Sequence, residues 1–176
     1  MASQSAENEG FRILDELVCD AIVDPSAASA SPTTRTMNSH SVRYRTQWAA
    51  QFYVAAELTR RGYLTALTFG NAALSDLLVQ SPQGHAFTVD VKGQSTRNFW
   101  LVQRREGNAN HYFVLVYLPP HFEPPQFFVL SSKQLMTHRG EYEVASKARG
   151  KYRDDLGGMN FTTALPHRDK WNVLPR

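Results

Sequence analysis

The chain has 176 residues, of which 42% are hydrophobic and 20% charged, and this composition is typical of a soluble globular domain. The longest apolar runs, such as residues 112–118, are too short to cross a membrane, and the polar, acidic residues 1–9 exclude a secretory signal. Cys19 is the only cysteine, which excludes an internal disulfide and favours the cytoplasm. The formal net charge of +3 is too small to indicate a nucleic-acid partner by itself.

The first 40 residues differ in character from the rest of the chain. Apolar residues recur at helical spacing over residues 10–23, and residues 23–40 are rich in Ser, Ala, Thr and Pro, as in a linker. We therefore expect an N-terminal extension over residues 1–40 and a folded domain over residues 41–176. The helix of the extension docks either on this domain or on a protein partner, and the sequence leaves both open.

The first half of the folded domain is predicted to be one helix followed by three strands. Apolar residues at three- and four-residue steps predict a helix from about Tyr44 to Arg61, ended by Gly62. The strands are separated by two turns, one at Gly70-Asn71 and one at residues 81–85. The predicted strands span residues 63–69, 76–80 and 86–92.

The second half is predicted to alternate between strands and short helices. Two strands are expected at 111–118 and 126–131, and the first is apolar enough to be covered on both faces. Ser131 or Ser132 is expected to cap a short helix through Met136. Residues 141–152 are weakly helical, and the C-terminal segment carries Trp171 and Leu174 on a final short helix. Together these elements indicate an α/β domain with a mixed central sheet and helices on its faces.

The strand at 86–92 carries the residues with the clearest chemistry. Alternation puts Asp90 and Lys92 on one face and turns Val91 into the core. An aspartate and a lysine two residues apart can equally form an ordinary salt bridge, because this pattern is common by chance.

Two further acidic residues favour a functional site at this strand over an ordinary salt bridge. If the strands at 76–80 and 86–92 form a hairpin, Asp76 lies close to Asp90 or Val91. Glu57 interrupts an otherwise apolar stretch of the first helix, where a carboxylate is unexpected unless it faces a partner.

The ordered motifs QFYVAAELTRRGY, GNAALSDLLV and FTVDVKGQS resemble the PD-(D/E)XK nuclease superfamily. The resemblance covers about residues 42–175 and includes the segment DKWNVL near the C-terminus. It implies a restriction-endonuclease-like fold, a three-layer α/β core with a mixed central sheet flanked by helices in α-β-β-β-α-β order. Two positions depart from the usual pattern. Ser75 replaces the motif's proline, and Asp90 stands where glutamate is more frequent.

The resemblance also implies a metal site on this core. Asp76, Asp90 and the carbonyl of Val91 would bind Mg²⁺, with Mn²⁺ as a substitute, and Glu57 would complete the shell. Lys92 would position the attacking water and stabilise developing negative charge. Gln94 would help to orient the lysine or a substrate phosphate.

We therefore expect a Mg²⁺-dependent nuclease that hydrolyses phosphodiester bonds of DNA, with a homodimer as the assembly suggested by analogy. Two alternatives keep the fold: a catalytically inactive nucleic-acid-binding or assembly subunit, and a defence or toxin effector nuclease. Other site types are excluded more easily, since the chain has no phosphate-binding glycine loop. Its six histidines are scattered singly, without zinc-like spacing, and are expected to be structural or on the surface.

Overall fold

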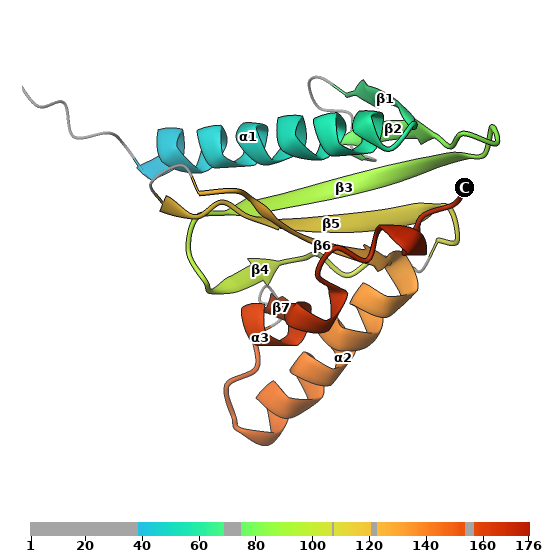
Figure 1. Cartoon of the computed structure of the whole chain (residues 1–176). Helices are drawn as coiled ribbons and strands as arrows, with labels where there is room; N and C mark the ends of the chain where they lie inside the picture. The colour runs from blue at the N-terminus through green and yellow to red at the C-terminus, as the bar shows by residue number, and fades with distance from the viewer. Residues whose placement is uncertain (1–38, 69–74, 107, 121–122, 154–156) are drawn as a thin grey trace, which may run out of the picture. The chain divides into compact units, whose positions relative to one another are not determined.

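The computed structural model describes residues 39–68, 75–106, 108–120, 123–153 and 157–176. The predicted extension over residues 1–40 lies outside these residues except for its last two positions. The described elements run from helix α1 through strands β1 to β6, helix α2 and strand β7 to three short C-terminal helices (Figure 1). No described helix combines the length and the apolar character that a membrane span requires.

Helix α1 spans Ser39–Arg60 and is the longest described helix. Ala50, Val54 and Leu58 lie on one side of it and are fully buried. The helix ends before Gly62, whose φ of +89° is a left-handed conformation that glycine adopts without steric cost. The predicted helix is confirmed, and it begins five residues earlier than the apolar pattern indicates.

A five-stranded sheet forms the middle of the domain. Its spatial order is β1-β2-β3-β5-β6, with β3 and β5 parallel and every other pair antiparallel. The mixed sheet predicted from the sequence is therefore confirmed. The strands span Leu64–Leu67 (β1), Leu77–Gln80 (β2), Ala86–Gln94 (β3), His111–Tyr117 (β5) and Gln126–Ser131 (β6).

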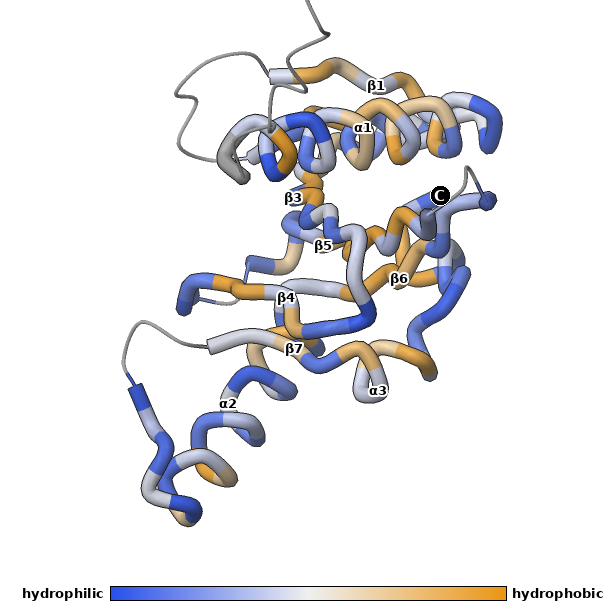
Figure 2. Tube along the Cα trace, turned by 90° about the vertical axis from the view of Figure 1, so that its left-hand side faces the viewer, coloured by the Kyte–Doolittle hydropathy of each residue, from blue (hydrophilic) through white to orange (hydrophobic). Residues whose placement is uncertain are grey.

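Helices cover both faces of this sheet, so the domain has three layers (Figures 1 and 2). Alternation along β5 sends Val114 and Val116 into the core under α1, which Trp171 and Leu174 also join. The alternate residues of β5 point into a second core, built with α2. Apolar residues dominate the strands of both cores, and this burial provides most of the driving force for folding.

The element order differs from the prediction between β3 and β5. The described residues there form no helix, and Phe99–Leu101 instead forms β4, which pairs with β7, Gly158–Asn160. The two short helices expected between residues 132 and 152 are one helix, α2, spanning Ser132–Ala148. Its N-terminus has the expected serine cap, since the Ser131 side chain accepts from the Gln134 backbone N–H.

The C-terminal segment completes the second core and returns to the sheet. It consists of α3 (Phe161–Ala164) and two 3₁₀ turns, η2 (Leu165–His167) and η3 (Trp171–Val173). The final short helix predicted around Trp171 is therefore confirmed as a single turn.

Candidate active site

The candidate site lies where β3 continues beyond its partner β2. The last antiparallel pair is Leu77 with Val89, so no strand among the described residues lies beside residues 90–94 on the β2 side. Gly93 and Gln94 lie beyond the predicted end of the strand at residue 92, yet they belong to it because they pair with β5 on its other side. This leaves a row of backbone groups at the β2 edge that must find other partners.

Asp76, the residue before β2, supplies one of these partners. Its Oδ2 accepts the Val91 backbone N–H at 2.7 Å. The hairpin therefore brings Asp76 to Val91, as the sequence predicted. Burial raises the pKa of the Asp76 carboxyl, and the hydrogen bond from Val91 and the charge of Lys92 act in the opposite direction.

Gln47 of α1 supplies the next partners along the same edge. Its Nε2 donates to the Val91 carbonyl at 2.7 Å, and its Oε1 accepts the Gly93 N–H at 3.1 Å. The side-chain amide thus makes the two hydrogen bonds that a neighbouring strand would make. Sequence reasoning missed Gln47, because nothing in its local pattern distinguishes it from a surface glutamine.

A second glutamine of α1 contacts Asp76. Gln51 lies one helical turn after Gln47, and its Nε2 donates to Asp76 Oδ1 at 2.8 Å. The Oε1 atom of Gln51 is buried and has no hydrogen-bond partner among the described residues. An unpaired buried amide oxygen is costly, so it indicates an acceptor available to a donor or a cation at this point.

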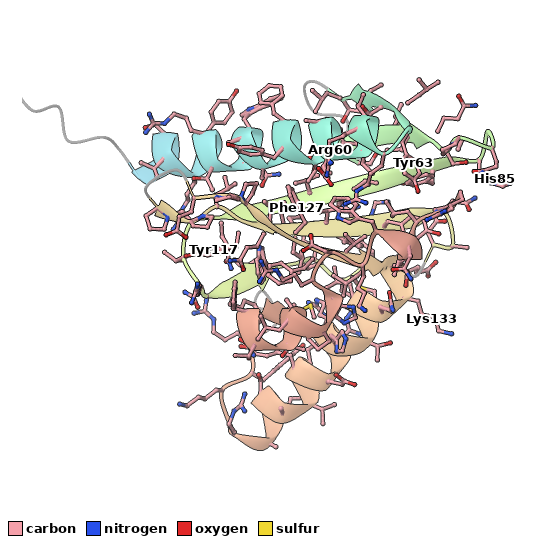
Figure 3. All side chains as sticks on the ribbon, in the orientation of Figure 1. Arg60, Tyr63, His85, Tyr117, Phe127 and Lys133 are labelled. Atoms are coloured by element: carbon pink, nitrogen blue, oxygen red, sulfur yellow. The ribbon has the colours of Figure 1, made fainter. Side chains whose placement is uncertain are left out.

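Among the described residues, Glu57 pairs with arginines rather than with this group, so its predicted place in the metal shell stays a prediction. It lies six residues after Gln51, which turns it by about 120° around the helix axis. Its Oε1 is 2.8 Å from Arg60 Nη2 and 2.7 Å from Arg61 Nη2, at the last turn of α1 where Figure 3 labels Arg60. The hydrogen bond from Arg60 lowers the pKa of the Glu57 carboxyl, with burial opposing it.

Asp90 points to the opposite face from Val89 and Val91, which lie in the core under α1. Its carboxylate is almost completely buried, and its Oδ2 lies 3.1 Å from Arg105 Nη1. Its charge raises the pKa of Asp76, so the two carboxylates are close enough to interact. An isolated buried carboxylate would be unfavourable, and Arg105 provides the compensating charge.

His111 was expected to be structural or on the surface, yet it lies beside Asp90. Its Nε2 is 3.8 Å from Asp90 Oδ2, and its Nδ1 is 2.7 Å from Thr88 Oγ1. Burial lowers the pKa of His111, while the negative charge of Asp90 raises it. Parallel pairing of β3 with β5 could have predicted this position of His111. It sets Thr88 opposite His111 and Asp90 opposite Phe113, so His111 lies in the next pair on the same face as Asp90.

Lys92 lies on the same strand face as Asp90, as alternation predicted. It is half-buried, and its ammonium makes no ion pair or hydrogen bond with any of the residues that the structure describes. Two pockets meet at Lys92: the α1 pocket, of about 550 Å³, and the α2 pocket, of about 890 Å³. A lysine with an unengaged ammonium between two pockets is available to an anionic ligand.

The oxygen atoms at this edge fit a hard divalent cation. They are the carboxylates of Asp76 and Asp90, the carbonyl of Val91 and the free amide oxygen of Gln51. Mg²⁺ prefers such oxygens and keeps several of its waters, so it needs only a partial cage. No group of three or more histidine, cysteine or acidic side chains suited to a metal is found in the described part of the chain.

The similarity of this chain to known proteins is low. No protein-family model matches the chain. No curated protein matches it either. A solved structure described as a bacterial homing endonuclease is similar over 74% of this chain and 90% of its own, with 14% sequence identity and a TM-score of 0.46.

Proposed function

We propose that this protein is a Mg²⁺-dependent nuclease that hydrolyses phosphodiester bonds of DNA. The observation that carries the proposal is the meeting of Asp76 and Val91 at the open edge of β3, beside Asp90 and Lys92. The order and spacing of these residues are those of the PD-(D/E)XK resemblance. The proposal is supported by the hydrogen bond from the Val91 N–H to Asp76, which brings Asp76 next to Asp90's neighbour although the two aspartates are 14 positions apart along the chain.

Asp76, Asp90 and the Val91 carbonyl would hold the cation, and Gln51 replaces Glu57 as the contribution of α1. When bound, Mg²⁺ lowers the pKa of a coordinated water and offsets charge on the phosphate. Gln47 fixes the peptide that carries the Val91 carbonyl, so the ligand oxygen keeps its orientation. Lys92 orients the attacking water and stabilises the negative charge that develops on the phosphate oxygens.

Arg105 and His111 both lie beside the carboxylate of Asp90 and would influence how its negative charge is balanced. Arg105 neutralises Asp90 in the arrangement described above and would move toward the substrate phosphate as a cation takes its place. His111 packs edge-on against Phe113, with ring centroids 4.8 Å apart, and keeps solvent away from the buried side of Asp90.

The test is cleavage of plasmid and of linear single- and double-stranded DNA with Mg²⁺, Mn²⁺ or EDTA. Asp76→Asn, Asp90→Asn and Lys92→Ala are each expected to reduce the rate by about 100-fold or more, because each removes a group that acts on the transition state. Glu57→Gln is the matched control, since it alters a carboxylate that is bonded to arginines away from the site. Cleavage that persists in Lys92→Ala, or that disappears in Glu57→Gln, contradicts the proposed site.

A second candidate, a catalytically inactive nucleic-acid-binding subunit, is favoured by one observation. Both acids already interact with other groups of the protein. Asp76 accepts hydrogen bonds from Gln51 and from the Val91 N–H, and Asp90 forms an ion pair with Arg105. Salt-sensitive DNA binding without cleavage of any substrate in Mg²⁺ or Mn²⁺ would favour this candidate.

A further inference from the structure

The two pockets that meet at Lys92 adjoin each other, because they share lining residues. Lys92 and Leu101 line both of them. The α1 pocket extends from Lys92 toward the first half of α1, where Arg43 and Thr46 line it. The α2 pocket extends in the other direction, toward Arg104 and the second half of α2. The site therefore has a hollow on each side of Lys92, one toward α1 and one toward α2.

The charge along this path is strongly positive. The lining residues include five basic side chains and one acidic side chain, Glu143. A concave surface of one charge concentrates ligands of the opposite charge, and a nucleic-acid backbone carries one negative charge for each phosphate. The basic residues are Arg43, Lys92, Arg104, Arg139 and Lys147.

The single acid organises the α2 pocket rather than neutralising it. Glu143 is buried and forms ion pairs with Arg139 and Arg104, one through each carboxylate oxygen. Arg139 is itself buried, and its Nε donates to the Val102 carbonyl at 2.9 Å. Glu143 thus holds the guanidinium of Arg104, whose side chain is 69% exposed, at the wall of the pocket.

Lys147 stands one helical turn after Glu143 and is also held in place. Its Nζ lies 4.6 Å from the ring centroid of Tyr152, which lines the same pocket. The pocket therefore presents Arg104 and Lys147, two exposed cations that protein contacts pre-orient. Pre-orientation lowers the entropy that binding costs and favours a defined ligand over diffuse ion attraction.

The α1 pocket contributes a donor of a different kind. The Nε2 atom of Gln94 is buried and has no hydrogen-bond partner among the described residues, although Gln94 lines this pocket. A buried amide N–H₂ group without an acceptor is unfavourable, and an oxygen atom of a bound ligand would supply the missing acceptor.

We propose that the α2 pocket is a phosphate subsite for the strand that crosses the active site. Arg104 and Lys147 contact a backbone phosphate next to the one that reacts, and Glu143 and Arg139 are positioning residues that orient Arg104. On the other side of Lys92, Gln94 donates to the strand in the α1 pocket. The subsite deepens the proposed nuclease function and rests on it for the identity of the ligand.

The test is binding of a labelled DNA, single-stranded and duplex, to the full chain in EDTA across a range of salt concentrations. Arg104→Gln and Lys147→Gln are each expected to weaken binding by about tenfold. Each change should also reduce the slope of log K against log salt by about one. Both side chains are exposed, so neither change should prevent folding.

Lys133→Gln is the matched control, because Lys133 is an exposed lysine of the same helix that lines neither pocket, at the position labelled in Figure 3. It should leave affinity and salt slope near those of the unaltered protein. Glu143→Gln should weaken binding despite removing a negative charge, because Arg104 loses its anchor.

Three results would overturn the subsite: no DNA binding at low salt, unaltered binding by Arg104→Gln and Lys147→Gln, or equal losses in Lys133→Gln. Failure of the nuclease proposal is distinguishable. An absence of cleavage in Mg²⁺, together with the expected binding losses, would leave a nucleic-acid subsite on an inactive protein.

Discussion

At the scale of single residues, the site depends on how closely α1 approaches β3. A Cβ atom at Gly93 would lie 2.6 Å from the Cβ of Ala50 and 2.8 Å from the carbonyl oxygen of Thr46. Both distances are far below van der Waals contact, so the approach requires a residue without a side chain. Gln47 reaches the backbone of β3 only because the helix lies this close.

Gly93→Ala is therefore expected to lower the free energy of unfolding by about 1–3 kcal/mol, since it forces the helix away from the strand. The matched control is Gly140→Ala, in the interior of α2, where an added Cβ would meet nothing within 4 Å. That change should raise the free energy of unfolding by about 0.5–1 kcal/mol, because alanine favours the helix. Urea unfolding measures both, and equal destabilisation by the two changes would contradict the close approach.

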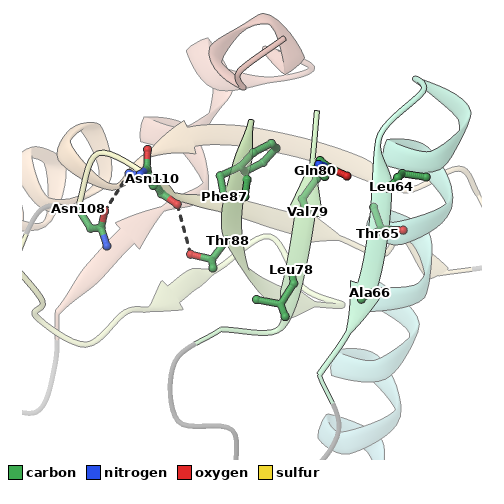
Figure 4. Close-up of a pocket in the computed structure, with 11 residues that line it drawn as sticks. Leu64, Thr65, Ala66, Leu78, Val79, Gln80, Phe87, Thr88, Asn108 and Asn110 are labelled. Carbon is green, nitrogen blue, oxygen red and sulfur yellow. Dashed lines mark hydrogen bonds between the residues drawn. The ribbon is translucent and has the colours of Figure 1, made fainter. Parts of the chain in front are cut away.

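At the scale of elements, the position of Asp76 depends on the register of β2. Leu77 faces the core under α1 and is fully buried, whereas Leu78 lies on the opposite face and is 51% exposed. Figure 4 shows Leu78 between Ala66 of β1 and Thr88 of β3, its neighbours across the sheet. A shift of one residue would exchange the two leucines and move Asp76 away from Val91.

We expect Leu77→Ala to cost about 2–5 kcal/mol of unfolding free energy, and Leu78→Ala no more than about 0.5 kcal/mol. Equilibrium unfolding in urea gives both values on the same protein background. A larger cost at Leu78 than at Leu77 would mean that the register, and with it the site, is wrong.

Local patterns predicted the elements whose signal lies within a few residues. Alternation gave the faces of Asp90 and Lys92, and the turn at residues 81–85 gave the hairpin that brings Asp76 to Val91. The strands β4 and β7 escaped prediction because each has three residues and their pairing joins segments about 60 residues apart. The contacts of Gln47 and Gln51 could not be predicted, because the sequence does not reveal which side of α1 faces the open edge of β3.

At the scale of the whole domain, cation binding and folding are linked. The proposed ligands come from α1, from the residue before β2 and from β3, so the cation would join three segments of the native state. A ligand that binds only the folded protein stabilises it, by about 2.7 kcal/mol at a hundredfold excess over its Kd. That stabilisation does not require turnover.

Saturating Mg²⁺ is accordingly expected to raise the Tm by roughly 5 °C relative to EDTA. Asp76→Asn and Asp90→Asn should abolish the difference between the two conditions, whatever their effect on the starting Tm. Glu57→Gln should preserve it. If Mg²⁺ raises the Tm of both aspartate variants as much as that of the unaltered protein, the cation does not bind at this site.

The strand-like hydrogen bonding of Gln47 has a consequence for backbone dynamics. In the part of the chain that the structure describes, no strand lies on the side of β3 to which the Gly93 N–H points, and its acceptor is a side chain of α1. It can exchange with solvent deuterium whenever α1 moves away, even while β3 and β5 remain paired. Its exchange rate therefore reports the docking of α1 on the sheet, separately from the unfolding of the sheet itself.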